Sequence, residues 1–434
     1  MSATVRRHEV MFAGAGDGEG DLSWGQIDIW LSMAKLGHAM AMGGVRPLPE
    51  GTSVTDVEAE LRYVMSRYQT MRTQLAFDAA GWPRQVVHAA GVIDLEVFDA
   101  GSDEPEAVAA AIEARYRDEP FDYTTQWPLR MAVVCRGDAC LFIVMIASHI
   151  ALDGAAAAIM MRESDSRSTA PVAGTWPIDQ AREQAGPAGQ RQNAAALRHW
   201  DRNLRAIPVP RMPPSRDPRQ PRHWTGLFRS AALPKALHAA ASQDGLDAGA
   251  ALLATFALAF ARVGGPAVLP LRITVGNRFR PALTQAVGPV SQAGLCVIDT
   301  DGDFREVLRR AHAATLAACK YAYFDRRDLE RLLATIVAER GAEIELDVSV
   351  NDRRSGGNAQ DVPAPAQSSF EWLSAADGES SALFLNVDGS DEAIAVTVYL
   401  DSHFLAPGDA EAMLWAMEEI ALAAAVDVAA AAYE

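Results

Sequence analysis

His149 and Asp153 stand four residues apart, and Gly154 follows them, so the chain contains the pattern H-x-x-x-D-G. The apolar run of residues 141–147 comes just before and predicts a strand buried on both faces. An imidazole at the end of such a strand can accept or orient a proton, because imidazole changes its charge near neutral pH. Glycine permits a tight turn and a close approach of the backbone to a substrate. The pattern therefore marks a candidate proton-transfer site.

Five segments in order, this motif among them, resemble the condensation-domain family of nonribosomal peptide synthetases, which has the chloramphenicol acetyltransferase fold. The family signature is H-H-x-x-x-D-G, and its second histidine is the active-site residue. Here His149 takes that position and Ser148 replaces the first histidine. The other segments that resemble family motifs are distributed along nearly the whole chain: residues 22–30 (L-S-x-x-Q-x-x-x-W), 67–73 (R-H-E-x-L-R-T), 120–130 (P-F-D-L followed by P-L-R) and 347–351, a strand that ends in Asn.

Strands alternate with helices along the whole sequence, which predicts an α/β or α+β class. The resemblance implies more: two chloramphenicol acetyltransferase-like lobes in a V-shaped pseudo-dimer, with the active site in a tunnel between them. We expect residues 1–190 to form an N-terminal lobe that carries the SHxxxDG motif, and residues 191–434 to form a C-terminal lobe.

Local patterns predict the boundaries of several elements. A capping-box pattern predicts a helix that begins at Ser23, and a second helix is expected to start near Thr55. Residues 242–262 are predicted to form one helix. Two stretches rich in Pro, Gly, Ser or Arg, residues 164–189 and 208–222, are predicted to be irregular connections.

The resemblance implies acyl transfer from a thioester on a carrier's pantetheine arm, with His149 taking a proton from the attacking amine or hydroxyl, or orienting it. It also implies that Asp153 pairs with Arg72 and so supports the motif structurally. Ser148, His149 and Asp153 together contain the chemical groups of a hydrolase triad. However, the chain has no G-x-S-x-G nucleophile elbow, so a serine hydrolase is disfavoured.

In the second half, residues 276–288 resemble a family stretch that contains Gly and Arg. The aromatic residue and Asn that should follow are replaced by Val-Ser-Gln-Ala-Gly at 290–294. Asn351 matches the strand-end Asn, and it is a candidate substrate-binding residue together with Ser349 and Gln292. An Asn that starts a turn is the alternative interpretation of Asn351.

The net charge of −17 argues against a nucleic acid or an anionic membrane surface as partner, because both attract basic faces. The four cysteines form no C-x-x-C pair, so we expect no metal site. Cys135 and Cys140 flank a predicted Gly137–Asp138 turn and are expected to be reduced core thiols, a disulfide across the hairpin being the alternative. No nucleotide-binding fingerprint is present, and we expect no tightly bound cofactor. The longest apolar run, residues 248–261, is too short to span a bilayer, so a cytoplasmic location is expected.

These observations favour a free-standing condensation enzyme, or one domain of an assembly line, that forms an amide or an ester. Its expected partners are peptidyl or acyl carrier proteins, which present the substrate on 4'-phosphopantetheine, and the acceptor is a second carrier or a small amine or alcohol. The arginines of residues 211–222 are a candidate docking patch for an acidic carrier. Three alternatives remain: an inactive relative that recruits another protein, an epimerisation relative, and an acyltransferase that uses coenzyme A.

Overall fold

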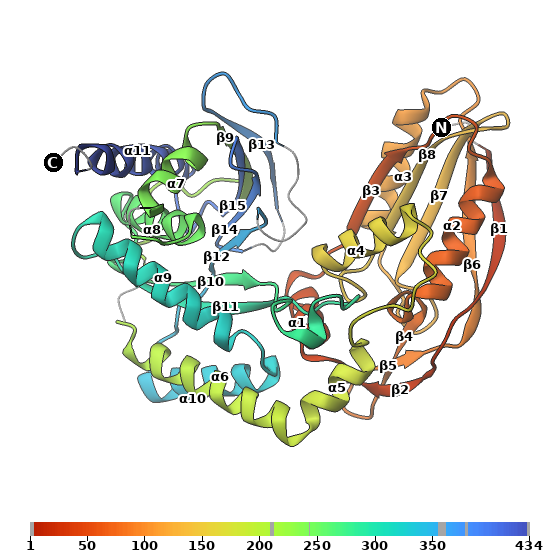
Figure 1. The fold of residues 1–434 in the computed structure, drawn as a ribbon, viewed down its shortest axis with the longest axis horizontal. Helices are drawn as coiled ribbons and strands as arrows, with labels where there is room; N and C mark the ends of the chain where they lie inside the picture. Colours follow the sequence, from red (N-terminus) through yellow and green to blue (C-terminus); the bar gives the residue numbers. More distant parts are fainter. Residues whose placement is uncertain (1–3, 209–211, 243, 355–361, 378–380, 432–434) are drawn as a thin grey trace. The chain divides into compact units, whose positions relative to one another are not determined.

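The computed structural model describes most of the 434 residues, and its chain divides into two compact units (Figure 1). Unit 1 combines residues 1–190 with residues 277–291, and unit 2 combines residues 191–276 with residues 292–434. The segment 277–291, from the second half of the sequence, therefore belongs with the first half. The residues that the structure describes are 4–208, 212–242, 244–354, 362–377 and 381–431.

Unit 1 contains a five-stranded mixed sheet in the order β1-β6-β7-β8-β3 and a small sheet in the order β2-β5-β4. Its strands are β1 (Thr4–Ala13), β2 (Gly18–Asp21), β3 (Met42–Pro47), β4 (Thr73–Phe77), β5 (Pro83–Val87), β6 (Ala90–Asp99), β7 (Leu129–Arg136) and β8 (Ala139–Ala147). Its helices are α1 (Trp24–Leu36), α2 (Val54–Arg67), α3 (Pro105–Asp118), α4 (Gly154–Asp165), α5 (Pro177–Ala185) and the 3-10 turns η1 (Gln69–Arg72) and η2 (Pro281–Leu283).

Helices cover both faces of the larger sheet of unit 1. Leu61 of α2 and Ile159 of α4 belong to one buried cluster together with Leu95 and Val133 from the strands. On the other side α3 packs against β7 and β8 in a second cluster. Because both faces are covered, β8 is apolar along most of its length, as predicted for residues 141–147.

Unit 2 contains a seven-stranded mixed sheet in the order β11-β10-β12-β14-β15-β9-β13. Its strands are β9 (His223–Ser230), β10 (Val268–Val275), β11 (Gln292–Asp299), β12 (Val348–Asp352), β13 (Ser369–Ala376), β14 (Leu383–Gly389) and β15 (Ile394–Asp401). Its helices are α6 (Pro187–Ala206), which starts in the last residues of unit 1, α7 (Leu233–Ser242), α8 (Ala248–Arg262), α9 (Phe304–Tyr321), α10 (Arg326–Arg340) and α11 (Pro407–Ala431).

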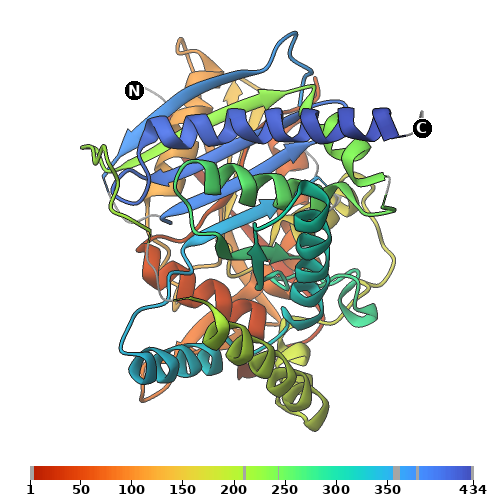
Figure 2. The same ribbon diagram turned by 90° about the vertical axis from the view of Figure 1, so that its left-hand side faces the viewer.

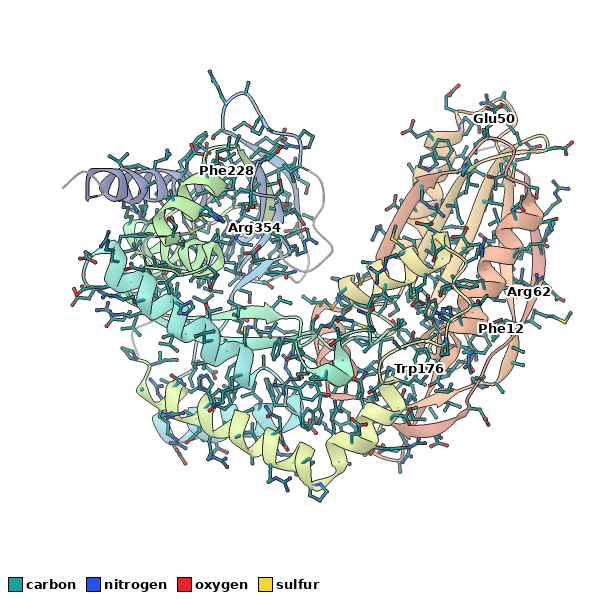
Figure 3. The ribbon with its side chains drawn as sticks, viewed as in Figure 1. Phe12, Glu50, Arg62, Trp176, Phe228 and Arg354 are labelled. Atoms are coloured by element: carbon teal, nitrogen blue, oxygen red, sulfur yellow. The ribbon has the colours of Figure 1, made fainter. Side chains whose placement is uncertain are left out.

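The core of unit 2 lies between its sheet and the helices α7, α8, α9 and α11. Figure 2 shows the long helix α11 lying across this layer beside α7 and α8. Phe228 of β9, labelled in Figure 3, is fully buried here and makes an edge-to-face contact with Trp415 of α11 at 5.1 Å between ring centroids. A separate cluster joins α6 and α10 through Trp200 of α6, Phe324, which lies just before α10, and Leu329 of α10.

The mixed sheets with their helices confirm the predicted fold class, but several boundaries differ from the predictions. The capping box of Ser23 is confirmed, and the helix expected near Thr55 begins at Val54, where Ser53 and Asp56 form the capping box. The predicted irregular segment 164–189 is wrong, since it contains α5 and the start of α6. Both helices begin with proline, which is tolerated in the first turn because the N–H of that position has no partner inside the helix.

The helix predicted over residues 242–262 ends where expected, at Arg262, but begins later than predicted. α7 ends at Ser242, and α8 begins at Ala248, where the carboxylate of Asp247 accepts a hydrogen bond from the Ala250 amide at 2.9 Å. Gly245 and the capping residue Asp247 are the sequence signals for this later start.

Candidate active site

His149 lies in the turn that connects the end of β8 to the start of α4 in unit 1. Its Nδ1 lies 2.8 Å from the carbonyl oxygen of Leu152, so in the neutral ring Nδ1 carries the hydrogen and donates it. The lone pair of the neutral imidazole is then on Nε2. The backbone amide of His149 is 3.5 Å from the carbonyl of Ala39, which ties the turn to the segment after α1. The imidazole is half-buried, so this arrangement leaves a partly accessible proton acceptor.

The hydroxyl of Ser148 is fully buried and lies 2.7 Å from the phenol oxygen of Tyr123. The amide of Ser148 donates to the carbonyl of Pro128 at 2.9 Å. Ser148 is thus hydrogen-bonded to a tyrosine within the protein interior. The residue that replaces the first motif histidine therefore has a hydrogen-bond partner, Tyr123, that lies 25 residues earlier in the sequence.

Asp153 is a buried carboxylate that accepts hydrogen bonds from three directions. It caps α4 by accepting from the Ala156 amide at 2.9 Å. It also accepts from the amides of Val290 and Ser291 at 3.0 and 3.1 Å, and from the Ser291 hydroxyl at 2.9 Å. Arg278 completes the set as a bidentate partner, with its two terminal nitrogens 2.9 and 2.8 Å from the two carboxylate oxygens.

The electrostatics of Asp153 follow from these contacts. Burial alone would raise the pKa of this carboxyl, because burial disfavours the charged form. The positive charge and the hydrogen bonds of Arg278, with the amides of Ala156 and Val290, outweigh burial and hold the pKa below its ordinary value. Asp153 is therefore ionised and fully engaged, which is the arrangement of a structural anchor.

The predicted pair between Asp153 and Arg72 is wrong. Arg72 is fully buried, and its guanidinium donates to the backbone carbonyls of Gly16, at 2.6 Å, and of Ala15 and His88. Arg278, and not Arg72, pairs with Asp153. The segment 277–291 belongs to unit 1 and brings the Arg278 side chain to the motif. Arg72 instead holds together backbone segments that precede β2 and follow β5.

Gly154 is the first residue of α4, directly after the capping aspartate, as the sequence indicated. His149, Ser148, Asp153 and Gly154 therefore occupy one continuous connection from β8 to α4. Arg278, Ser291 and Tyr123 were not predicted as site residues. Arg278 and Tyr123 lie in family-like segments, 276–288 and 120–130, but neither segment indicated that they contact the motif.

The three candidates of the second half lie in unit 2 and are not all close to one another. Ser349 and Asn351 are on β12, and the Asn351 amide donates to Asn386 of β14 at 3.0 Å. Gln292 begins β11, which β10 separates from β12 in the sheet. Its buried amide donates to the Phe324 carbonyl at 2.9 Å and accepts from the Phe324 amide at 3.3 Å.

Within the described residues, no group of three or more His, Cys, Asp or Glu side chains is arranged to hold a metal ion. In the same part of the chain, no helix combines the length and the apolar character that crossing a membrane requires.

A model of the family described as "Condensation domain" matches residues 29–351. The chain belongs to the condensation-domain family. Its relatives include a linear gramicidin synthase of Brevibacillus parabrevis, which is 25% identical over 304 residues. That alignment covers 65% of this chain and 4% of the relative, so the chain matches only a small part of that protein's length.

Solved structures share the fold of this family member. The condensation domain that mediates chain release from the enacyloxin polyketide synthase has a TM-score of 0.70 at 19% identity, covering 94% of this chain and 82% of the other. The X-domain of teicoplanin biosynthesis, solved in complex with OxyB, has a TM-score of 0.73 at 20% identity, covering 96% and 95%. At these identities the likeness shows the fold alone.

Proposed function

We propose that this chain is a condensation enzyme of nonribosomal peptide or hybrid biosynthesis. It transfers an acyl or aminoacyl group from the pantetheine thioester of a carrier protein to an amine or a hydroxyl, forming an amide or an ester. Membership of the condensation-domain family supports this proposal. The observation that carries it is the contact between Nδ1 of His149 and the Leu152 carbonyl, because it leaves Nε2 as the proton acceptor in a partly accessible position.

In the proposed reaction, Nε2 of His149 accepts a hydrogen bond from the N–H or O–H of the acceptor. As the acceptor attacks the thioester carbonyl, a C–N or C–O bond forms and the proton moves to Nε2. The tetrahedral intermediate then collapses, the C–S bond breaks, and the imidazolium returns the proton to the leaving sulfur. The products are the amide or ester and the free thiol of the carrier, so the enzyme returns to its starting state.

The residues around His149 have supporting roles in this proposal. Asp153, saturated by Arg278, Ser291 and backbone amides, holds the turn to α4 and is a positioning residue. Gly154 is the proposed amide donor to the oxyanion, since the first amides of a helix stabilise negative charge. Arg72 supports the backbone of unit 1 through three carbonyls.

Ser349 and Asn351 of unit 2 remain proposed contacts for the substrate. Gln292 is proposed to support the fold of unit 2, because its amide group is occupied by the backbone of Phe324. The partner carrier protein brings the acyl group as a pantetheine thioester, which is a substrate of the proposed reaction and not a bound cofactor.

The arginines of residues 211–222 were predicted to dock an acidic carrier protein, but their contacts within this chain give that prediction little support. Arg211 lies outside the described residues. The other three pair with acidic side chains: Arg216 with Asp409, Arg219 with Asp217 and Arg222 with Asp401. Their charges are partly neutralised, so a carrier is proposed to use apolar contacts as well.

A second candidate function is recruitment of a partner protein without catalysis. The observation in its favour is the shared fold with the X-domain that was solved in complex with OxyB. The buried Ser148 in place of a histidine is compatible with it. An epimerisation relative is a weaker alternative, because the sequence offers no clear second acid or base opposite His149.

In the test, a carrier protein loaded with an acyl group is incubated with this chain and a mixed pool of amines and alcohols. Intact-mass spectrometry of the carrier then measures whether the acyl group has been removed. We expect the wild-type chain to unload the carrier into a new amide or ester, and His149→Ala to fail. His238→Ala, which changes an exposed histidine of α7, is the matched control and should unload normally. If no variant unloads any donor of a broad set, yet the carrier co-elutes with the protein, recruitment replaces catalysis.

A further inference from the structure

A pocket of about 230 Å³ lies entirely within unit 1, beside the His149 turn. Its walls come from α1, the residues that follow α1, the end of α3 and the segment that leads to Tyr123. The residues that decide its chemistry are Trp30, His38, Asp118, Glu119, Phe121 and Tyr123.

Two contacts connect this pocket to the motif. Tyr123, which lines the pocket, bonds through its hydroxyl to Ser148 at 2.7 Å. Ala39, which also lines it, offers its carbonyl to the His149 amide at 3.5 Å. A molecule in the pocket therefore contacts Tyr123 and Ala39, which are hydrogen-bonded to Ser148 and His149.

The pocket walls include an ordered set of aromatic rings. The rings of Trp30 and Tyr123 meet nearly edge to face, with centroids 6.2 Å apart and planes at 73°. Phe121 stacks on Tyr123 at 5.8 Å and 14°. Aromatic faces bind apolar bodies and also attract organic cations, because the face of the ring carries partial negative charge. Phe121 already has the Arg130 guanidinium over its ring at 3.9 Å, so Trp30 and Tyr123 are the rings proposed to contact a ligand.

The charged side chains favour a cationic ligand. Asp118 and Glu119 line the pocket and are exposed to solvent. Arg117 also lines it, but its guanidinium is engaged by the Glu113 carboxylate at 2.8 Å and donates to the carbonyls of Ala41 and Gly43.

Arg130 lies nearby, and its positive charge interacts with Glu119. Its guanidinium covers the Phe121 ring at 3.9 Å and donates to the carbonyls of Tyr116, Glu119 and Pro120. The guanidinium groups of Arg117 and Arg130 thus donate hydrogen bonds to groups of the protein itself. Asp118, together with Glu119, gives the pocket its attraction for a positive charge.

We propose that this pocket binds the acceptor, and that the acceptor is a small free primary amine with an aromatic or aliphatic body. The inference rests on the proposed function. The volume is below the roughly 300–1,000 Å³ of drug-sized ligand sites, which suits a small molecule. An amine arrives as an ammonium ion, which Asp118 and Glu119 attract, whereas a neutral alcohol of the same shape gains a hydrogen bond from them but no attraction between opposite charges.

The proposed step balances in atoms and charge. The ammonium loses one proton to solvent and becomes a neutral amine. The nitrogen then forms the C–N bond while its second proton moves to His149, which passes it to the leaving sulfur as the C–S bond breaks. The net products are an amide, the carrier thiol and one proton in solution.

Calorimetric titration of the full chain with 2-phenylethylamine and 2-phenylethanol tests the ligand class. We expect the amine to bind at least about tenfold more tightly than the alcohol. The double variant Asp118→Asn/Glu119→Gln should lose this preference and keep its weak affinity for the alcohol. Asp138→Asn, in the exposed turn between β7 and β8, is the matched control and should bind both as the wild type does. Equal binding of amine and alcohol to the wild type, or an unchanged preference in the double variant, overturns the proposal.

The carrier-unloading assay separates this inference from the proposed function. If the carrier is unloaded and the double variant raises the KM for the amine about tenfold at unchanged kcat, both stand. Unloading by wild type and double variant with equal KM overturns the pocket proposal and leaves the condensation activity. Selective binding of the amine with no unloading of any donor overturns the condensation activity and leaves the amine site.

Discussion

Asp153 and Arg278 form a buried bidentate ion pair although 125 residues separate them in the sequence. The pair holds the segment 277–291 against the turn that carries His149, since the same carboxylate also binds the amides of Val290 and Ser291. The geometry of the candidate site therefore depends on a contact between two distant parts of the chain.

Replacing Arg278 with Met should destabilise unit 1 strongly. Removal of one partner leaves the carboxylate of Asp153 buried without its main counter-charge, a change that typically costs about 3–5 kcal/mol. Urea unfolding, followed by circular dichroism, measures the loss. Arg216→Met, which removes an arginine that is mostly exposed, is the control and should change the unfolding free energy within experimental error. A similar small change for Arg278→Met would show that the pair contributes little.

The ion pair also predicts how stability depends on pH. The pKa of Asp153 in the folded chain lies below its ordinary value of 3.8, so its stabilising contribution is complete above that value. The contribution is lost as the pH falls from about 4 through the folded-state pKa. In Asp153→Asn, which cannot ionise, the unfolding free energy should fall less steeply with pH in this acid range. Parallel slopes for the two proteins would contradict the depressed pKa.

Local sequence patterns predicted a large part of the fold and one part of the site. The apolar run of residues 141–147 predicted β8, and the capping box of Ser23 predicted the start of α1, because these signals depend on neighbouring residues. The motif from Ser148 to Gly154 was found for the same reason. The alternation of strands and helices was sufficient to predict the fold class.

The partners of the motif were not predicted because they depend on long-range packing. The sequence contains two suitable arginines, Arg72 and Arg278, and nothing local shows which of them reaches Asp153. Tyr123 is similar: its bond to Ser148 spans a connection and the strands β7 and β8. Such contacts are set by the tertiary fold, so they emerge only when the sheet order and the path of residues 277–291 are known.

Tyr123 and Ser148 should be energetically coupled. Tyr123→Phe leaves the fully buried Ser148 hydroxyl without its partner, which should destabilise the protein by about 1–3 kcal/mol. In the double variant Tyr123→Phe/Ser148→Ala both polar groups are gone, and the loss should be smaller than the sum of the single losses. A double-mutant cycle by urea unfolding measures the coupling, for which we expect about 0.5–3 kcal/mol. Strict additivity would show that the hydrogen bond has no net effect on stability.

Cys135 and Cys140 should behave as buried, reduced thiols. They face each other across the β7–β8 hairpin with their sulfur atoms 2.9 Å apart, and both are free cysteines. Burial, reinforced by the bond to Cys140, raises the pKa of Cys135 to about 12. At pH 8 this thiol is therefore almost entirely protonated, and the thiolate is the reactive form. A maleimide reagent should leave the peptide with both cysteines unlabelled in the native chain and label it fully in guanidinium chloride. If that peptide resists labelling in guanidinium chloride and becomes reactive only after reduction, the two residues form a disulfide and the prediction fails.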